Sequence, residues 1–440
     1  MFTRVTPEGT DAVSKRTGKR WLVGTMVLTG GLVAAACGSG TPSATANKTT
    51  TTTTHSAKKS TATTTTTAAG TTTTAAGTTP TTAAGGGTAT PTTVKKSSTP
   101  TTTKTTTPPT SGSNGANALG GANDFNTPAA ALTGAGSTFD QPLFARQFFD
   151  YNKSNSKVTV NYASVGSGAG ETDILAGSVN FGASDVPEPG STTGSGGAIL
   201  QVPVVLGGIA IVTQSCPKGT HITGTQITQI YKGTITDWGS IPGCTAGPIE
   251  PVYRADSSGT SNAFTNYLHS VDPTDWGSNL VGKQPTFPKG EGGNGNSGVA
   301  GDVQAGGGTI GYVELDYALQ SGLPYLAVQN SSGAFVLPNG TSVAADAAAF
   351  PNVTADNYLI VNGSGAGSYP ISTYSWVIIY QKQSNSNNGI ALGKMLHWMA
   401  TAGQADSSAI GYVALPSNIQ ALAISTIMKM ENSSGQPLFS

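Results

Sequence analysis

Histidine and cysteine are scarce in this chain, which has 4 histidines and 3 cysteines in 440 residues. The histidines are scattered, so a histidine-based metal centre or catalytic triad has little support. The sequence also has no P-loop, HExxH, CxxC or GxSxG motif, which are patterns that mark nucleotide, zinc, redox and serine-hydrolase sites. We therefore expect a protein that uses no cofactor, holds no metal and is not an enzyme.

The start of the chain has the order of a secretory signal. Basic residues at 15–20 precede an apolar stretch, Trp21–Ala36, which is too short for a comfortable membrane span and ends in small residues. Cys37 follows where a bacterial lipoprotein carries its lipid. We expect a lipoprotein signal over residues 1–36 and a lipid anchor at Cys37. The alternative is an ordinary secretion signal followed by a stray cysteine.

Residues 37–128 lack the apolar side chains of a folded core. They are almost entirely Thr, Ala, Ser, Gly and Pro with a few Lys. Such a segment cannot bury enough apolar surface to fold. We expect a disordered linker that holds a folded part, residues 129–440, outside the cell membrane to which the chain is anchored.

The formal net charge of zero hides an asymmetry. Residues 1–128 contain 11 Lys and Arg but 3 Asp and Glu, so the rest of the chain keeps 11 of the 22 basic and 19 of the 22 acidic residues, a net charge of −8. An acidic folded part argues against a nucleic acid partner, which requires a basic face. An anion would have to be held by local dipoles and hydrogen bonds.

Cys216 and Cys244 remain once Cys37 is assigned to the lipid anchor. A lone pair of cysteines in a secreted domain predicts a disulfide bond between them. Two free buried thiols are the alternative.

The folded part alternates strand-like apolar runs with amphipathic helical stretches. The strand-like runs are Val158–Val165, Val202–Val212, Thr309–Val313 and Trp376–Tyr380, and the helical ones are Gln141–Tyr151, Asn262–Val271 and Ile390–Met399. This alternation predicts an α/β fold with ligands at the carboxyl ends of strands. Roughly three hundred residues is long for one core, so we expect two lobes with a cleft. Gly290–Gly295 matches G-x-G-x-x-G, but we expect no strand before it and interpret it as a loop at the cleft edge.

Glycine, serine and threonine gather before stretches that can start helices. The segments are Thr133–Phe139 (TGAGSTF), Val165–Gly170 (VGSGAG) and Arg254–Ser261 (RADSSGTS). Small residues let the backbone approach a ligand, and helix starts offer unpaired N–H groups and partial positive charge. Three such ends meeting would form an oxyanion pocket. Asp185, at the end of FGASD (181–185), adds a carboxylate, which suits an anion that carries a proton.

The candidate ligands are donors from these loops together with that carboxylate: Thr138, Phe139, Ser167, Asp185, Arg254, Ser258, Gly259 and Thr260. Asp256 is expected to pair with Arg254 and hold its planar fork in place. Sulfate, which has no proton for Asp185, would be disfavoured. Each loop also has a plainer interpretation. Thr138, Asp140 or Asp185 would be a helix cap, the turn around Ser167 would be merely flexible, and Arg254 would form an incidental surface ion pair.

Together these loops resemble the phosphate-binding proteins of high-affinity phosphate ABC importers, the PstS family. The resemblance covers nearly all of residues 130–430 and rests on TGAGSTF at 133–139, NYASVGSGAG at 161–170, FGASD at 181–185 and RADSSGTS at 254–261. Further motifs that support the resemblance lie at 227–238 (ITQIYKGTITDW), 292–301 (GGNGNSGVAG), 309–318 (TIGYVELDYA) and 369–373 (YPIST).

The resemblance implies a two-lobed periplasmic-binding-protein fold (type II) with a hinge. Lobe I would span about 130–202 and 372–440, and lobe II about 203–371. The candidate ligands would hold inorganic phosphate and deliver it to the membrane permease and ATPase subunits of an importer. The chain differs from the family pattern at Asp140, where Pro is usual, and at Ser257, where Gly is common. Neither change removes a ligand, but Asp140 would add a negative charge near the mouth.

Two other functions are alternatives at this point. A phosphoester hydrolase would use Ser258 as nucleophile and would need a base or metals that the sequence does not offer. A surface adhesin or phosphate sensor would use the same fold on its stalk without transport.

Overall fold

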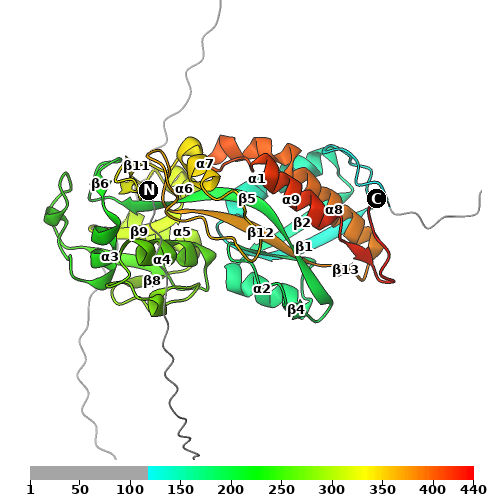
Figure 1. Ribbon diagram of the computed structural model, residues 1–440, viewed down its shortest axis with the longest axis horizontal. Helices are drawn as coiled ribbons and strands as arrows, with labels where there is room; N and C mark the ends of the chain where they lie inside the picture. The colour runs from blue at the N-terminus through cyan, green and yellow to red at the C-terminus, as the bar shows by residue number, and fades with distance from the viewer. Residues whose placement is uncertain (1–116) are drawn as a thin grey trace, which may run out of the picture. The chain divides into compact units, whose positions relative to one another are not determined.

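The computed structural model describes residues 117–440, and a mixed nine-stranded sheet runs through them (Figure 1). In order across the sheet the strands are β2 (Val158–Ser164), β1 (Ala130–Gly136), β3 (Phe181–Ser184), β12 (Ser372–Tyr380), β5 (Gly197–Thr213), β9 (Thr309–Glu314), β7 (Glu250–Arg254) and β8 (Glu291–Gly293), with β4 (Thr193–Gly194) on β5. The signal, Cys37 and the linker up to residue 116 lie outside the described residues.

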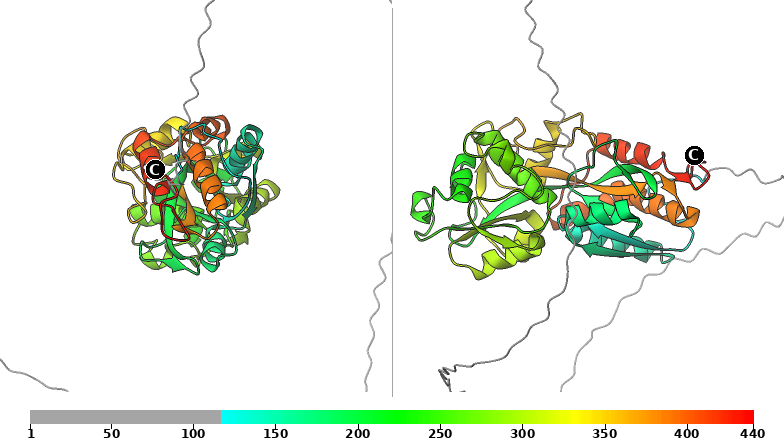
Figure 2. Two further views of the ribbon diagram at one scale, coloured as in Figure 1. Left: turned by 90° about the vertical axis from the view of Figure 1, so that its right-hand side faces the viewer. Right: turned by 90° about the horizontal axis from the view of Figure 1, so that it is seen from below.

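Two groups of parallel strands flank a central antiparallel pair. β1 pairs in parallel with β2 and β3, and β7 pairs in parallel with β8 and β9. β12 is antiparallel to β3 and β5, and β5 is antiparallel to β9. In Figure 1 and in the right-hand view of Figure 2, β5 and β12 run between the two groups. The division into two lobes at these strands, with the boundaries given above, stays a prediction.

Helices cover the sheet on both faces. They are α1 (Gln141–Ser154), α2 (Ser167–Ala176), α3 (Gly224–Lys232), α4 (Gly259–Val271), α5 (Gly295–Ala305), α6 (Leu315–Gln320), α7 (Gly340–Ala348), α8 (Ser386–Ala400) and α9 (Ser417–Ile427), with short 3-10 helices η1 (Trp238–Ser240), η2 (Ser278–Leu280) and η3 (Ala402–Ile410). The α/β fold that the sequence predicts is thereby confirmed. None of the helices among residues 117–440 is long and apolar enough to cross a membrane.

The predicted helices are present, and their caps explain where they begin. α1 carries Pro142 in its first turn and buries Leu143, Phe144 and Tyr151. α4 begins at Gly259, earlier than predicted, because the side chain of Ser258 accepts a hydrogen bond from the N–H of Ser261. α8 likewise begins earlier than predicted, after an asparagine cap at position 385.

The central strands are buried on both faces. In β5 every residue from Val202 to Thr213 is buried, and in β12 only the last residue, Tyr380, is not. Continuous apolar runs of this kind are typical of strands covered by helices on each side. A smaller apolar cluster around Val212, Val299 and Val313 packs α5 against β5 and β9.

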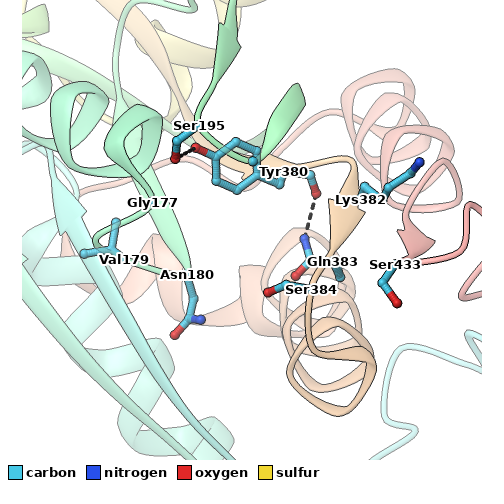
Figure 3. Close-up of a pocket in the computed structure, with 10 residues that line it drawn as sticks. Gly177, Val179, Asn180, Ser195, Tyr380, Lys382, Gln383, Ser384 and Ser433 are labelled. Carbon is cyan, nitrogen blue, oxygen red and sulfur yellow. Dashed lines mark hydrogen bonds between the residues drawn. The ribbon is translucent and has the colours of Figure 1, made fainter.

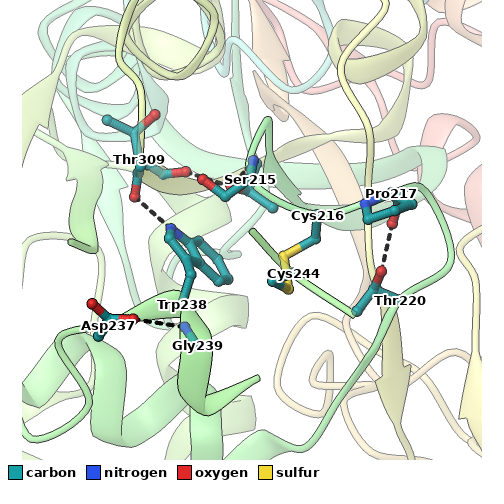
Figure 4. The surroundings of a disulfide bond; sticks show 11 residues. Ser215, Cys216, Pro217, Thr220, Asp237, Trp238, Gly239, Cys244 and Thr309 are labelled. Carbon is teal, nitrogen blue, oxygen red and sulfur yellow. Dashed lines mark hydrogen bonds between the residues drawn. A yellow bond between two sulfur atoms is a disulfide. The ribbon is translucent and has the colours of Figure 1, made fainter. Parts of the chain in front are cut away.

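Two small sheets complete the described part. One contains β6 (His221–Ile222), β10 (Ala327–Gln329) and β11 (Phe335–Val336), and the other β13 (Lys382–Gln383) and β14 (Glu431–Asn432). Beside the first, the structure joins Cys216 to Cys244 by a disulfide, as the sequence predicts (Figure 4). The indole of Trp238 lies next to this bond and donates to the carbonyl of Gly308 at 2.8 Å.

The folded part begins earlier than residue 129. Leu119 is buried in the main core, and the N–H of Asn117 donates to the carbonyl of Leu438 at 2.8 Å. Asp124 forms an ion pair with Lys394 at 2.7 Å. The predicted linker boundary at 128 is therefore too late, because composition alone hides the few apolar and charged side chains that attach residues 117–128 to the domain.

Candidate anion site

The site lies where strands from both groups end and helices begin. β1 ends at Gly136 before α1, β2 ends at Ser164 before α2, and β3 ends directly before Asp185. On the other side β7 ends at Arg254 before α4, and β8 ends before α5. Parallel strands present their carboxyl ends at one edge, so these helix starts meet there. The helix at the G-x-G-x-x-G segment was not expected, and α5 adds a fourth helix start.

Asp185 lies in the middle of the site and is almost fully buried, with 1 % exposure. Its Oδ1 accepts a hydrogen bond from Ser137 Oγ at 2.7 Å, and its Oδ2 accepts one from Thr260 Oγ1 at 3.4 Å. Burial raises the pKa of Asp185 to about 6, although hydrogen bonds and the charge of Arg254 act in the opposite direction. At neutral pH this group is an ionised acceptor close to its titration range.

Arg254 is buried and is oriented as the sequence predicts. Its Nε donates to Asp256 Oδ1 at 2.7 Å, and a terminal nitrogen contacts the other carboxylate oxygen of Asp256. The remaining terminal nitrogen donates to Thr260 Oγ1 at 3.3 Å. Burial acts to raise the pKa of Asp256, but the bonds and charge of Arg254 and the Gly295 N–H outweigh it and lower the pKa. Asp256 therefore stays ionised and holds the guanidinium with one N–H edge toward Thr260.

Ser167 and the start of α4 contact each other directly. The N–H of Gly259 donates to Ser167 Oγ at 3.1 Å, and the N–H of Gly168 donates to the carbonyl of Ser257 at 3.1 Å. A Cβ on Gly259 would lie 2.4 Å from the Cβ of Asp185. Only glycine therefore allows α4 to approach the carboxylate this closely.

Ser258 acts as the cap of α4, with Ser261 N–H as its partner at 3.2 Å. Within residues 117–440 no base is hydrogen-bonded to its hydroxyl, which a nucleophile would need. The same residues contain no group of three or more His, Cys, Asp or Glu placed to hold a metal ion. The geometry thus gives the phosphoester hydrolase alternative no support.

Thr138 and Phe139 lie on the opposite side of the site. Thr138 Oγ1 accepts hydrogen bonds from Asn296 through its backbone N–H at 3.1 Å and its side-chain amide at 2.9 Å. The backbone N–H of Phe139 donates to Ser137 Oγ at 3.1 Å. Tyr317 Oη donates to the carbonyl of Thr138 at 2.6 Å. The first loop is thereby attached to α5 and α6.

All of the candidate ligands are brought together in one buried place, and the partnership of Asp256 with Arg254 is present. Their roles toward a ligand stay predictions. The site also includes Ser137, Asn296 and Ser375, which the sequence analysis did not select. Ser137 and Asn296 lie inside motifs on which the resemblance rests, so those motifs could have pointed to both residues. Ser375 lies inside the apolar strand β12, where no sequence motif marks it as a site residue.

Asp140 differs from expectation. It precedes α1 but makes no side-chain cap bond, and it is fully buried rather than exposed at a mouth. Its Oδ2 accepts a hydrogen bond from Ser375 Oγ at 2.9 Å. The prediction of an extra charge near the mouth is wrong in position, because the side chain turns inward toward β12.

Two hollows on the molecule differ in their relation to the site. A cavity of about 560 Å³, with Thr138, Asp256, Gly295 and Tyr317 in its wall, opens beside the candidate ligands. Another, of about 380 Å³, is lined by Tyr380, Lys382 and other residues and lies away from them (Figure 3). The first cavity therefore adjoins the candidate ligands, and the second does not.

Comparison with known proteins agrees with this geometry. The model of the PBP superfamily domain matches residues 105–402. The phosphate-binding protein PstS of Xylella fastidiosa is 34% identical over 70% of this chain and 88% of its own length, and that of Haemophilus influenzae is 32% identical over 66% and 90%. This chain belongs to the PstS family.

Solved structures agree on the PstS-family fold. A phosphate-binding protein from Stenotrophomonas maltophilia superposes with a TM-score of 0.54 over 68% of this chain and 94% of that chain, at 22% identity. At that identity the likeness speaks for the fold alone. It agrees with the periplasmic-binding-protein architecture that the sequence predicts.

Proposed function

We propose that this member of the PstS family captures inorganic phosphate at the candidate anion site and delivers it to an ABC importer. The observation that carries the proposal is the pairing of opposite chemistries in one buried place. Arg254, hydroxyls and helix starts are donors suited to an oxyanion, and Asp185 beside them is an acceptor. An anion that carries a hydrogen satisfies both.

Discrimination against sulfate follows from the same acceptor. The hydrogen of hydrogen phosphate can be donated to a carboxylate oxygen of Asp185. Sulfate has no hydrogen at neutral pH, so its oxygen would face an unmatched carboxylate at a cost of several kcal/mol at order of magnitude. The chemistry is binding alone, and we propose a receptor rather than an enzyme.

Capture requires the two predicted lobes to close on the ion. The Gly259–Ser167 and Thr138–Asn296 hydrogen bonds join residues from opposite lobes, as do the contacts between Thr260 and Asp185. An ion that binds both sides stabilises the closed arrangement by its differential affinity. Release would then require opening, which the membrane permease and ATPase subunits would drive.

The chain is proposed to act at the outer face of the cell membrane, anchored through lipid on Cys37. The linker would let the receptor reach its permease while it remains attached. Metabolic labelling with a fatty acid, compared between the natural chain and Cys37→Ala, tests the anchor. Equal labelling of both would exclude it.

Calorimetric titration of the full chain, freed of endogenous ligand, with phosphate and with sulfate tests the binding function. We expect phosphate to bind and sulfate to bind far more weakly. Equal binding of both ions, or no binding of phosphate, would contradict the proposal. Phosphate uptake by cells that lack the gene, measured at low phosphate, separates transport from a sensor or adhesin role, since only a transport receptor reduces uptake when it is lost.

A further inference from the structure

The anion site contains a second buried carboxyl group to which the proposed function assigns no task. Asp140 is 0 % exposed. Its Oδ2 has a single partner, the Ser375 hydroxyl, and its Oδ1 has no hydrogen-bond partner among residues 117–440. The helix start that follows does not compensate, because the side chain makes no bond to the N–H groups of α1. An ionised carboxylate is costly in such a place.

The groups around Asp140 do not offset a negative charge there. The titratable and charged groups near Asp140 come from six parts of the fold. They are Tyr162 on β2, Asp185 after β3, Arg254 on β7, Glu314 on β9, Asp316 and Tyr317 on α6, and Tyr412 after η3. Burial raises the pKa of the three tyrosines, so they are neutral. Arg254 is the cation of this set, and its guanidinium is paired with Asp256.

Ser375 acts on both carboxyl groups. Its hydroxyl donates to Asp140 Oδ2 at 2.9 Å, and hydrogen bonding from Ser375 lowers the pKa of Asp185. A hydroxyl can accept one hydrogen bond while it donates another. A protonated Asp140 can therefore donate to Ser375 Oγ, where an ionised Asp140 can only accept from it.

Two carboxylates that share a buried site do not both ionise at low cost. Burial first, and then the charge of Asp185, raise the pKa of Asp140 well above its usual range. The negative charge is better stabilised on Asp185 than on Asp140, because Asp185 accepts hydrogen bonds from Ser137 and Thr260. When the two carboxyl groups hold one proton between them, that proton therefore lies on Asp140 and the negative charge lies on Asp185.

We propose that Asp140 is a proton-holding residue of the anion site, and that phosphate binds only when Asp140 is protonated and the Asp140–Asp185 pair carries one negative charge. The inference rests on the proposed phosphate function. Where Asp140 is ionised in the free protein, binding takes one proton from solvent onto the Asp140 carboxylate, because the incoming anion adds to the repulsion. Affinity then falls as pH rises through the titration of Asp140, beyond the change caused by the ionisation of phosphate itself.

The test is calorimetric titration of the full chain with phosphate between pH 6 and pH 10, in pairs of buffers that differ in ionisation enthalpy. The variants are Asp140→Asn, which is permanently neutral, and Asp150→Asn, the same change at a partly exposed position on α1, the helix that follows Asp140. We expect the affinity of the natural chain to fall more steeply at alkaline pH than that of Asp140→Asn, by up to about tenfold per pH unit. On binding phosphate, the natural chain should also take up as much as one proton more than Asp140→Asn takes up. Asp150→Asn should follow the natural chain.

The outcomes separate this inference from the proposed function. If the natural chain binds phosphate with the same pH profile and proton count as Asp140→Asn, the inference is wrong and the proposed function stands. If the natural chain does not bind phosphate at any pH, the proposed function fails and the inference fails with it. If Asp140→Asn does not fold, the number of protons that the natural chain takes up on binding phosphate, measured in the paired buffers, still tests the inference. No proton uptake beyond that of phosphate itself would overturn the inference.

Discussion

At the scale of single residues, the site combines one buried cation with two buried carboxyl groups. Arg254 is already neutralised by Asp256, so the charge left to attract an anion is small. The hydroxyls, N–H groups and helix starts must supply most of the attraction. Since each contributes little, the exact matching of donors and acceptors decides which anion binds.

Asp185→Asn tests the acceptor. The amide of asparagine can donate a hydrogen as well as accept one, so the penalty against sulfate is lost. We expect weaker phosphate binding and a ratio of phosphate to sulfate affinity reduced by about tenfold or more, which corresponds to about 1.4 kcal/mol. Calorimetry with both anions measures the ratio. Asp173→Asn, on α2, is the matched control, and an unchanged ratio in Asp185→Asn would remove the role assigned to the carboxylate.

Arg254→Ala and Ser167→Ala compare a charged donor with a neutral one. Loss of Arg254 also leaves the partly buried carboxylate of Asp256 without its charged partner, so its cost should be the larger. We expect a loss of phosphate affinity of about 100-fold for Arg254→Ala and about tenfold for Ser167→Ala, from bonds worth roughly 3 and 1 kcal/mol. Dissociation constants for both variants, with thermal melting to confirm folding, check the order. The reverse order would show that Arg254 does not face the ligand.

The candidate ligands were predictable because they lie in short loops whose composition has a chemical meaning. Gly, Ser, Thr and Arg at helix starts indicate an oxyanion site even before the loops are placed in space. Ser375 and the inward turn of Asp140 were not predictable. Both depend on β12 pairing with β3 and β5 across nearly two hundred residues of chain, which no local pattern reports.

At the scale of elements, an ion pair joins α2 to the segment after η2. Lys283 Nζ contacts Glu171, which is nearly buried and also accepts a hydrogen bond from Ser184 Oγ at 2.7 Å. The carbonyl of Lys283 accepts the N–H of Ser258, the cap of α4, at 2.8 Å. The pair thus links opposite sides of the predicted cleft next to the site.

Lys283→Met should weaken phosphate binding, because the closed arrangement loses a cross-cleft contact. Burial raises the pKa of Glu171 to about 7 even with Lys283 present, so without the lysine the carboxyl group takes up a proton and limits the loss. We expect about a tenfold loss at pH 8 and a smaller one at pH 6. A double-mutant cycle with Glu171→Gln should give a coupling of about 1 kcal/mol.

The control for that cycle is Lys289→Met. Lys289 pairs with Glu250 at 2.8 Å, but both side chains are 42% exposed and lie on the same side of the cleft. Such a pair contributes little. If Lys289→Met weakens phosphate binding as much as Lys283→Met, the effect of Lys283 does not come from closure.

Element boundaries were predictable to within a few residues where a cap could be recognised. The start of α4 depends on Ser258, a residue that the sequence analysis selected as a ligand or as a nucleophile. The strand β8 and helix α5 were missed at Gly290–Gly295, because four glycines obscure both the alternation of a strand and the apolar stripe of a helix. Their existence depends on the pairing of β8 with β7.

At the scale of the whole molecule, the described part contains several carboxyl groups whose pKa is raised by burial. Burial raises the pKa of Asp185 to about 6 and those of Glu171 and Asp346 to about 7, and it raises the pKa values of Asp140 and Glu314 well above their usual range. In the unfolded chain these groups ionise near pH 4. Between about pH 4 and pH 7 the folded protein therefore binds more protons than the unfolded chain.

The sign of the pH dependence follows. The free energy of unfolding decreases with rising pH wherever the folded state holds the extra protons. Without phosphate, the stability that Asp185, Glu171 and Asp346 contribute should be fully present below about pH 4 and should be lost progressively as the pH rises to about 7. Urea unfolding across this range, followed by tryptophan fluorescence, measures the trend.

Asp346→Asn isolates one of these groups. Asp346 is fully buried on α7, its Oδ1 accepts the Gly363 N–H at 2.8 Å, and its Oδ2 has no partner among residues 117–440. Asparagine keeps the acceptor and cannot ionise. A rise in pKa from 3.8 to about 7 corresponds to a few kcal/mol. Relative to the natural chain, the variant should therefore be more stable at pH 8 than at pH 4 by roughly 2 to 4 kcal/mol. Any constant cost of the new amide cancels in that difference. If the difference in stability between the two proteins does not change with pH, Asp346 is already ionised in the folded protein. Its buried charge would then be stabilised by something other than the contacts around α7.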